Sequence, residues 1–437
     1  MEKVYLGVLA NATDRRRVIL AVRGLLDFTY YVHFKVHTDE SLALMERALE
    51  NLHENKAVFE ELGIREHFNI SKLHKLLHYI KSIRARGIAP AFSTELSERL
   101  HIDFAKAGYR ASNHRDYIPQ MTKWLSRQEK VRKFSTFLEW TLPAYEAEFI
   151  RLQADDALEP DDTLPVQRPT SPSPPPTATL IHSIAKNPPF TLRADFIARE
   201  FHAPFFLFRL RDFLRSRSIL PRGDLSEGSS FPVYKQLALS IPPVAEVGTT
   251  VLLDKIHAIA RRESGNRKDG RVVETKPAQF DTVLVRVNGG NQELDPAKKY
   301  RAARLRVIFR VPEIYGSVHE PLAYVDWYKP LSRFNSDLGM YEISLSTQMN
   351  QQRSEIIPIT SILQSCHLIP VFGKQINPKW ESDFVLDQCS QFYLNPYLRH
   401  HDFYILRYLP ELEAKRKAAE ARRVRIRQLG RAGRFNT

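Results

Sequence analysis

Cysteine and long apolar runs are what this sequence most clearly lacks. Its two cysteines, Cys366 and Cys389, cannot build a disulfide framework, and they do not show the CxxC spacing of a structural zinc site. The apolar stretch LLDFTYYVHF is interrupted by Asp27 and His33, and no run approaches the roughly 18 residues that a membrane span requires. No apolar region follows the charged opening MEKVYL. We therefore expect a soluble protein of the nucleus or cytosol, with no membrane partner.

Signatures of nucleotide and hydrolase chemistry are missing as well. The chain has no P-loop, GxGxxG, GxSxG or HExxH segment. Glu98 and His101 form a single E-x-x-H unit, whereas a di-iron bundle needs two such units and two further glutamates. These absences leave no basis for a nucleotide-driven enzyme, a hydrolase triad or a zinc protease.

Positive charge is what the sequence has in excess. Lys and Arg together number 64 against 50 for Asp and Glu, which gives a formal net charge of +14. This balance favours polyanionic partners and predicts salt-sensitive binding. Ribosomal and chromatin proteins show the same balance, so the charge is consistent with DNA as partner without singling it out.

Apolar spacing divides the chain into regions of different kinds. Leu42, Met45, Leu49 and Leu52 recur at the helical period, whereas DTVLVRVN, ARLRVIFRV and MYEISLS alternate with period two. We predict an α+β multidomain protein. Its regions are an α-helical region at 1–152, a Pro/Ser-rich disordered linker at 153–180, a mixed helical connecting region at 181–278, a β-rich barrel-like domain at 279–405 and a basic helical tail at 406–437.

Carboxylates, cations and aromatics recur at helical spacing between Glu95 and Lys133. Glu95 and Glu98 lie on one face of the predicted helix, together with Ile102. The stripe beside that face holds Arg99, Asp103, Lys106 and Arg110. One face could hold metal while its neighbour holds phosphate. The alternative is that both glutamates are solvated charges on the helix surface.

These residues and their flanks resemble the C-terminal part of Plavaka-type transposases, a fungal family related to the CACTA-like and KDZ cut-and-paste transposases. Four blocks in order carry the resemblance. They are YLGVLANATDRRRVILAVRGLLDFTYYVHFKVHT, LGIREHFNISKLHKLLHYIKSIRARG, the segment from Glu95 to Lys133, and SEIIPITSILQSCHLIPVFGK.

The resemblance implies a DDE reaction centre, in which three carboxylates hold two divalent ions, here Mg²⁺. It matches Glu98 to the third acid, with Glu95 as the alternative, and it would place Glu98 on a metal only in a full-length site. It also implies that the N-terminal helices are the helical insertion and the last helix of an RNase H-like domain. The first two aspartates would then lie upstream of Met1. We therefore expect a catalytically incomplete chain that holds no cofactor alone.

The β-rich region resembles, more loosely, the bromo-adjacent homology (BAH) domains of chromatin proteins. The match runs through VDWYKP, YEISLS, IIPI and SCHLI. In that case an aromatic set would contact a peptide or methyl-lysine, because aromatic faces attract such cations. The set is Tyr324, Trp327, Tyr328 and Tyr341. Alternate members of the set could instead be core side chains.

Our leading interpretation is a transposase-derived, nuclear DNA-binding protein. The candidate DNA-binding residues are Arg99, Lys106, Arg110, Arg115, Lys415, Arg416, Lys417, Arg422 and Arg423. The alternative is a non-enzymatic module in which the β-rich region recognises chromatin or another protein. Homo-oligomers are left open, as is the DNA target site.

The missing carboxylates predict that the isolated chain lacks Mg²⁺- or Mn²⁺-dependent DNA strand cleavage, because one glutamate cannot position two metal ions. A plasmid-nicking assay with purified protein checks this. Nicking that is abolished by Glu98→Gln would show that a complete site exists in this chain.

Overall fold

The computed structural model describes residues 2–141, 179–220, 223–264, 274–287, 296–349, 351–373, 377–381 and 384–432. The chain forms two compact units. The interleaved unit consists of Met1–Ile88 and Thr177–Thr437, and the α7–α9 unit consists of Ala89–Pro176. The predicted α-helical region 1–152 is largely helical in its described residues, up to 141, and these are divided between the two units. The predicted linker at 153–180 lies outside the described residues up to residue 178.

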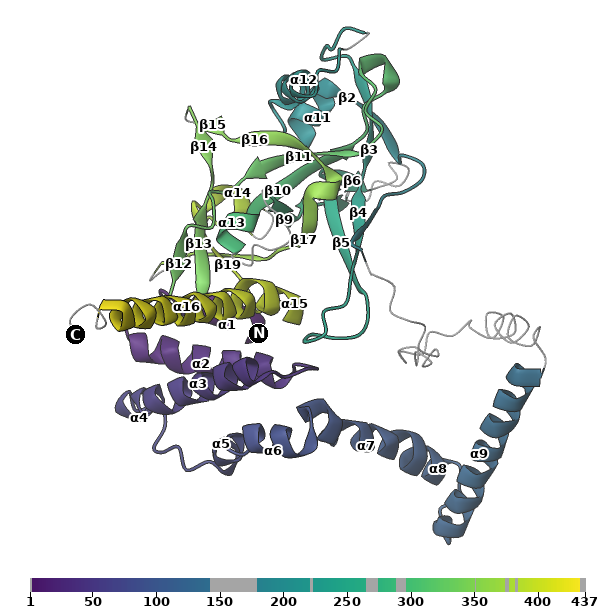
Figure 1. The fold of residues 1–437 in the computed structure, drawn as a ribbon. Helices are drawn as coiled ribbons and strands as arrows, with labels where there is room; N and C mark the ends of the chain where they lie inside the picture. The colour runs from purple at the N-terminus through teal and green to yellow at the C-terminus, as the bar shows by residue number, and fades with distance from the viewer. Residues whose placement is uncertain are drawn as a thin grey trace. The chain divides into compact units, whose positions relative to one another are not determined.

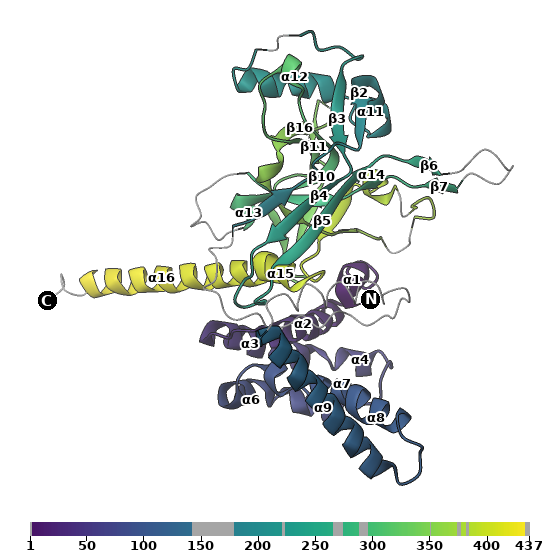
Figure 2. The same cartoon turned by 90° about the vertical axis from the view of Figure 1, so that its right-hand side faces the viewer.

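Two long helices dominate the N-terminal part of the interleaved unit. α2 (Arg16–Val32) and α3 (Asp39–Asn55) lie side by side (Figures 1 and 2). A Cβ atom on Gly24 would lie 2.7 Å from the Ala48 carbonyl oxygen, so a larger residue there would push the two helices apart. α3 begins at a capping box, because the Thr38 and Ser41 side chains each accept the other residue's backbone N–H. The accompanying helices are α1 (Glu2–Leu9), α4 (Val58–Glu61), α5 (Ser71–Leu76) and α6 (Tyr79–Arg86).

The C-terminal helices return to pack on α2 and α3. They are α15 (His400–Phe403), the π-helical turn η6 (Tyr404–Tyr408) and α16 (Leu409–Ala432). Figures 1 and 2 show α16 between the N-terminal helices and the β-rich part. Phe28, Tyr31, Phe403 and Tyr408 belong to one apolar core. The predicted basic tail is helical as far as it is described, to Ala432, but its first turns are part of this core rather than exposed to solvent.

A buried ion pair joins the two ends of the chain. Arg407 Nη2 donates to Asp27 Oδ2 at 2.8 Å, and Tyr397 Oη donates to Asp27 Oδ1 at 2.6 Å. The side chains of Arg407 and Asp27 are only 6% and 4% exposed, so the charges have left water and depend on each other. Gly339 has a φ of 68°, and a Cβ atom there would lie 2.9 Å from Arg407 Nε. Residues from three distant parts of the sequence therefore hold this arginine in place.

The strands form three sheets and two hairpins, and every recorded pairing is antiparallel. The main sheet contains β2 (Phe190–Arg193), β3 (Ser230–Tyr234), β9 (Thr282–Arg286), β10 (Tyr300–Phe309), β11 (Leu322–Trp327), β16 (Ser354–Pro358) and β17 (Ile362–Ser365). The second contains β1 (Ile181–Ser183), β4 (Gln236–Ile241), β5 (Leu252–Ile259) and β8 (Gln279–Phe280). The third contains β12 (Arg333–Asn335), β13 (Met340–Ser344), β18 (Leu368–Pro370) and β19 (Gln391–Leu394). The hairpins pair β6 (Arg262–Ser264) with β7 (Glu274–Lys276) and β14 (Thr347–Gln348) with β15 (Gln351–Gln352).

The β-rich character of the C-terminal part is confirmed, whereas the predicted barrel is not found as a closed structure. Pairing runs in the order β16-β11-β10-β9-β17. Its two end strands, β16 and β17, are joined through the 3₁₀ turn η5 (Ile359–Ser361), with no pairing recorded between them in the described part of the chain. The sheet is therefore curled but open.

The region 181–278 is only partly the helical connection that its sequence predicts. It contains α11 (Ala194–Glu200) and α12 (Phe206–Ser216), separated at Pro204 as expected. It also supplies β1 to β7 to the sheets and hairpins, which the prediction missed. Phe206 and Phe231 pack on Phe309 of β10 in the core under these helices. Short helices elsewhere are α13 (Pro296–Lys299) and α14 (Val385–Gln388).

Loss of the buried arginine should destabilise the interleaved unit. Removing one partner of a buried pair typically costs about 3–5 kcal/mol, because the other charge is left uncompensated. We expect Arg407→Leu to lower the free energy of unfolding by about that amount in urea denaturation. The matched control is Arg16→Leu, since Arg16 pairs with Asp337 in an ion pair that is 69% exposed on the arginine side, and it should change stability little. Equal losses from both variants would show that burial of the pair does not matter.

His400 should make stability depend on pH. Burial, and then the nearby His33, Lys3 and Lys35, lower the pKa of His400 to about 4. Its unfolded pKa is about 6.5, so below that value the unfolded chain binds more protons and stability falls as the pH drops from about 6.5 to about 4.

His400→Gln should flatten the fall in melting temperature over this window. Burial raises the pKa of the neighbouring Asp402 to about 6, which acts with the opposite sign, so the quantity to measure is the difference between variant and wild type. Parallel curves for the two proteins would rule out a neutral native His400.

Candidate nucleic-acid interface

Within its described residues the α7–α9 unit consists of two helical arms joined by a turn and set at a wide angle to each other (Figure 1). It runs through η1 (Ala89–Phe92), α7 (Glu95–Leu100), the π-helical turn η2 (His101–Lys106), α8 (Ala107–Arg110) and α9 (Tyr117–Thr141). The Gln120 side chain fixes the turn before α9, since its amide N–H groups donate to Asn113 Oδ1 at 2.7 Å and to the Arg115 carbonyl at 2.6 Å. His114 and Asp116 take positive φ values of 61° and 47° in this turn.

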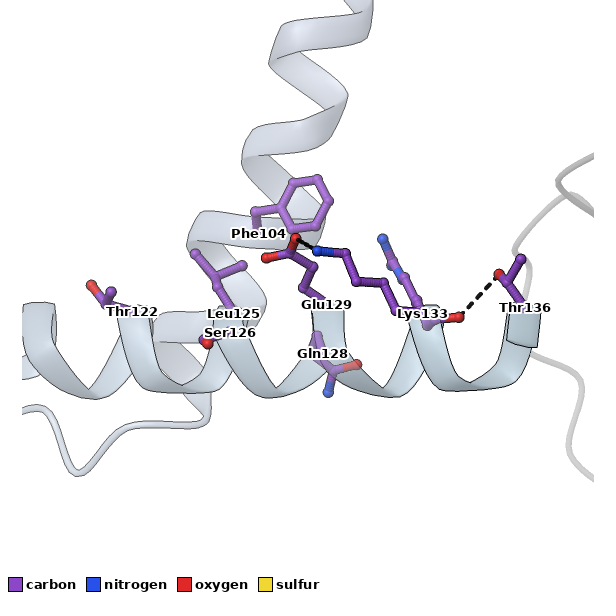
Figure 3. Close-up of a pocket in the computed structure, with 9 residues that line it drawn as sticks. Phe104, Thr122, Leu125, Ser126, Gln128, Glu129, Lys133 and Thr136 are labelled. Atoms are coloured by element: carbon purple, nitrogen blue, oxygen red, sulfur yellow. Dashed lines mark hydrogen bonds and ion pairs between the residues drawn. The ribbon is translucent and has the colours of Figure 1, made fainter. Parts of the chain in front are cut away.

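One face of α9 packs on the first arm, which runs from η1 to α8. Figure 3 shows Phe104 facing α9 near Glu129 and Lys133, which form an ion pair at 2.6 Å. The Arg132 guanidinium lies 5.6 Å from the Phe104 ring centroid, at cation–π distance. Gly108 lies against Trp124. A shallow cavity of about 750 Å³ lies along this contact.

Glu98, the predicted catalytic residue, lies on α7 and is exposed. Its side chain accepts a hydrogen bond from the Thr94 hydroxyl, with Oγ1 and Glu98 Oε1 3.2 Å apart. The side chain of the alternative, Glu95, lies outside the described residues. Among the residues that the structure describes, no group of three or more His, Cys, Asp or Glu side chains is placed to hold a metal ion. The described residues therefore place no set of three carboxylates together for the two-metal centre that the resemblance implies.

The predicted DNA-binding cations of this unit point into solvent. Arg99, Lys106, Arg110 and Arg115 are all exposed, and none of them forms an ion pair among the described residues. The stripe expected from Arg99 to Arg110 is altered by η2, because a π-helical turn has more residues than an α-helical one. The structure thus brings these cations to one helical arm but not to one straight line.

Sequence reasoning missed a second group of cations on α9. Lys123, Arg127 and Lys130 are exposed, and their spacing of four and three residues places them on one helix face. That spacing was visible in the sequence and could have identified them.

The predicted cations of the C-terminal tail differ from one another. Lys415 is half-buried, and burial followed by the nearby Arg47 lowers its pKa. Lys417 pairs with Glu413 at 3.1 Å, whereas Arg416 is exposed. Arg422 and Arg423 lie on α16, but their side chains are outside the described residues. The beginning of α16 therefore packs against the rest of the interleaved unit and is not a freely solvated basic helix.

The predicted aromatic peptide site is corrected by the structure. All four side chains are buried, with exposed fractions of 0% for Tyr324, 3% for Trp327, 0% for Tyr328 and 6% for Tyr341. Burial raises the pKa of Tyr324 to about 12. The physical reason is that each side chain belongs to an apolar core: Tyr324 to one, Trp327 to a second, and Tyr328 and Tyr341 to a third. No aromatic surface at these positions is open to a peptide.

The same strands instead line a charged cavity of about 450 Å³, here called the arginine cavity. Arg306 Nε donates to Asp326 Oδ2 at 2.7 Å, and Arg304 and Arg306 both donate to Asp387 Oδ1 at 2.7 Å. Arg304 Nε and Arg306 Nη1 have no hydrogen-bond partner within the described part of the chain. Two arginines and two aspartates balance in charge, so this cavity is not suited to a polyanion.

Comparison with known proteins gives no relative from which a function could be transferred. No protein-family model, no curated protein and no solved structure matches this chain. No helix in the described ranges combines the length and apolar character that a membrane crossing requires.

Proposed function

We propose that this chain is a transposase-derived nuclear protein that binds DNA through the α7–α9 unit and lacks a complete catalytic site of its own. The observation that carries the proposal is the set of exposed, unpaired cations on that unit. Four of them, Arg99, Lys106, Arg110 and Arg115, come from the first arm and the turn, and the face of α9 adds Lys123, Arg127 and Lys130.

The contrast with the interleaved unit supports this proposal. There, arginines are used to hold the fold together, as with Arg407 on Asp27 and Arg399 on Asp254 and Asp402. The charge of an arginine in such a pair is already balanced by a carboxylate, so the arginine is not available to an external phosphate. In the α7–α9 unit the seven cations named above are exposed, which leaves them free to neutralise phosphates and release counterions.

The arrangement favours binding without sequence selection. The exposed cations lie on a bent helical arm and on one face of α9, and contacts with phosphates position a protein on DNA without reading bases. The resemblance to Plavaka-type transposases adds to this proposal, because such enzymes act on DNA. An oligomer on DNA is compatible with it.

A second candidate function is recognition of a protein or chromatin partner by the β-rich region. The observation that favours it is the arginine cavity, where the unpartnered N–H groups of Arg304 and Arg306 would donate to a carbonyl oxygen of a ligand. Binding of this kind should be weakened by Arg304→Gln and unaffected by changes in the α7–α9 unit.

Neutralising the first-arm cations should weaken DNA binding and its salt dependence. For a duplex of arbitrary sequence, the triple variant Arg99→Gln, Lys106→Gln, Arg110→Gln should reduce the slope of log affinity against log salt by about 3, because about one counterion is lost per contact. Fluorescence anisotropy between low and physiological salt measures the slope.

The matched control removes the same charge from exposed lysines of the interleaved unit, with Lys186→Gln, Lys255→Gln and Lys329→Gln. It should leave the slope nearly unchanged. If the two triple variants lose the same slope, binding follows net charge alone and the proposed interface is wrong.

A further inference from the structure

One face of α9 carries a feature that phosphate binding does not explain. Phe134 and Phe137 are 62% and 52% exposed, and Trp140 beside them is 81% exposed. The Phe137 and Trp140 ring centroids lie 6.2 Å apart. Exposed aromatic rings grouped on a helix are typical of a binding surface, because an isolated soluble helix gains nothing from them.

These rings continue the line of α9 cations. Lys123, Arg127, Lys130, Phe134 and Phe137 follow one another at steps of four, three, four and three residues, which places them along a single face. We call this face the α9 stripe. It spans about 21 Å at 1.5 Å per residue, with cations in its first half and rings in its second. The opposite side of α9 is occupied by its contact with Phe104.

We propose that the α9 stripe binds single-stranded DNA, with phosphates along Lys123, Arg127 and Lys130 and unpaired bases stacked on Phe134 and Phe137. This inference rests on the proposed DNA binding and specifies that the bound DNA is single-stranded. A phenyl ring stacks on any base because every base has a π-face, and such stacking adds to phosphate contacts in single-strand grooves. In a duplex the base faces are already stacked on one another, so rings outside the helix cannot reach them.

A second copy of this chain fits the α9 stripe poorly. Steps of three and four residues are also those of a coiled-coil seam. However, a parallel partner would place Lys123, Arg127 and Lys130 against their own copies. An antiparallel partner would set the same cations against phenyl rings, and the cation–π contacts would leave six cations in one seam without an anion. The like charge on half of the stripe therefore favours a polyanion over a second helix.

The test compares a labelled 20-nucleotide oligo-dT with a 20-base-pair duplex, using the full chain. Phe134→Leu/Phe137→Leu keeps apolar bulk and a helix-forming side chain while removing the rings. It should weaken oligo-dT binding at least about 10-fold and duplex binding less than about 2-fold. Phe134→Trp/Phe137→Trp should restore or strengthen oligo-dT binding. Circular dichroism checks that the variants keep their helical content.

Phe208→Leu is the matched control, because Phe208 is 55% exposed on α12 with the Arg209 guanidinium 5.3 Å from its ring. It should leave oligo-dT binding unchanged. An equal loss from Phe208→Leu, or from the α9 double variant on the duplex, would overturn stacking at the α9 stripe. Stacking would also be overturned if the wild-type protein self-associates in sedimentation while the α9 double variant is monomeric and binds oligo-dT normally. Failure of wild-type protein to bind either DNA would instead refute the proposed function itself.

Discussion

The buried pair of Asp27 and Arg407 is the contact on which the organisation of this chain depends. It joins residues that are 380 positions apart, and Tyr397 and Glu411 complete its surroundings by bonding to Asp27 and Arg407, respectively. Two buried charges are unfavourable unless they meet. The pair therefore requires the α2–α3 helices and the C-terminal helices to be assembled together, and neither end of the chain can keep its charge buried alone.

This pair lies in the unit that is formed from two separate stretches of the sequence. The segment 89–176 forms the other unit. The two units use basic residues differently. The interleaved unit buries Arg304, Arg306 and Arg407 against aspartates, whereas the α7–α9 unit leaves the seven cations of the proposed interface exposed. Buried arginines thus stabilise the interleaved unit, and the cations that we propose contact DNA lie in the α7–α9 unit.

Much of the local structure follows from the sequence, because it depends on spacing along the chain. Leu42, Met45, Leu49 and Leu52 are buried in α3 as their helical period predicts. The period-two runs at β9, β10 and β13 are strands. The missed strands β3 and β4 also alternate between buried and half-buried residues, so their signal was present in FPVYKQLALSI and was overlooked.

The remaining features depend on contacts between distant segments, which spacing does not encode. A basic helix at the C-terminus predicts solvent contact, and only the approach of Asp27 makes Arg407 a core residue. Tyr324 and Trp327 were predicted to present an aromatic face, but layers from distant segments cover both sides of β11. For the candidate site, the type and position of the cations were predictable. The irregularity at η2 and the exposure of Phe134 and Phe137 required the structure.

The most direct test of this account is to replace residues 89–176 with a flexible Gly/Ser linker of about 20 residues. The account predicts a folded protein that unfolds in one cooperative transition, since the ion pair and cores of the interleaved unit are untouched. It also predicts that DNA affinity at low salt falls at least about 10-fold, because the unpaired cations are gone. An unfolded product would contradict the two-unit organisation, and a folded product with undiminished DNA affinity would contradict the assignment of DNA binding to the α7–α9 unit.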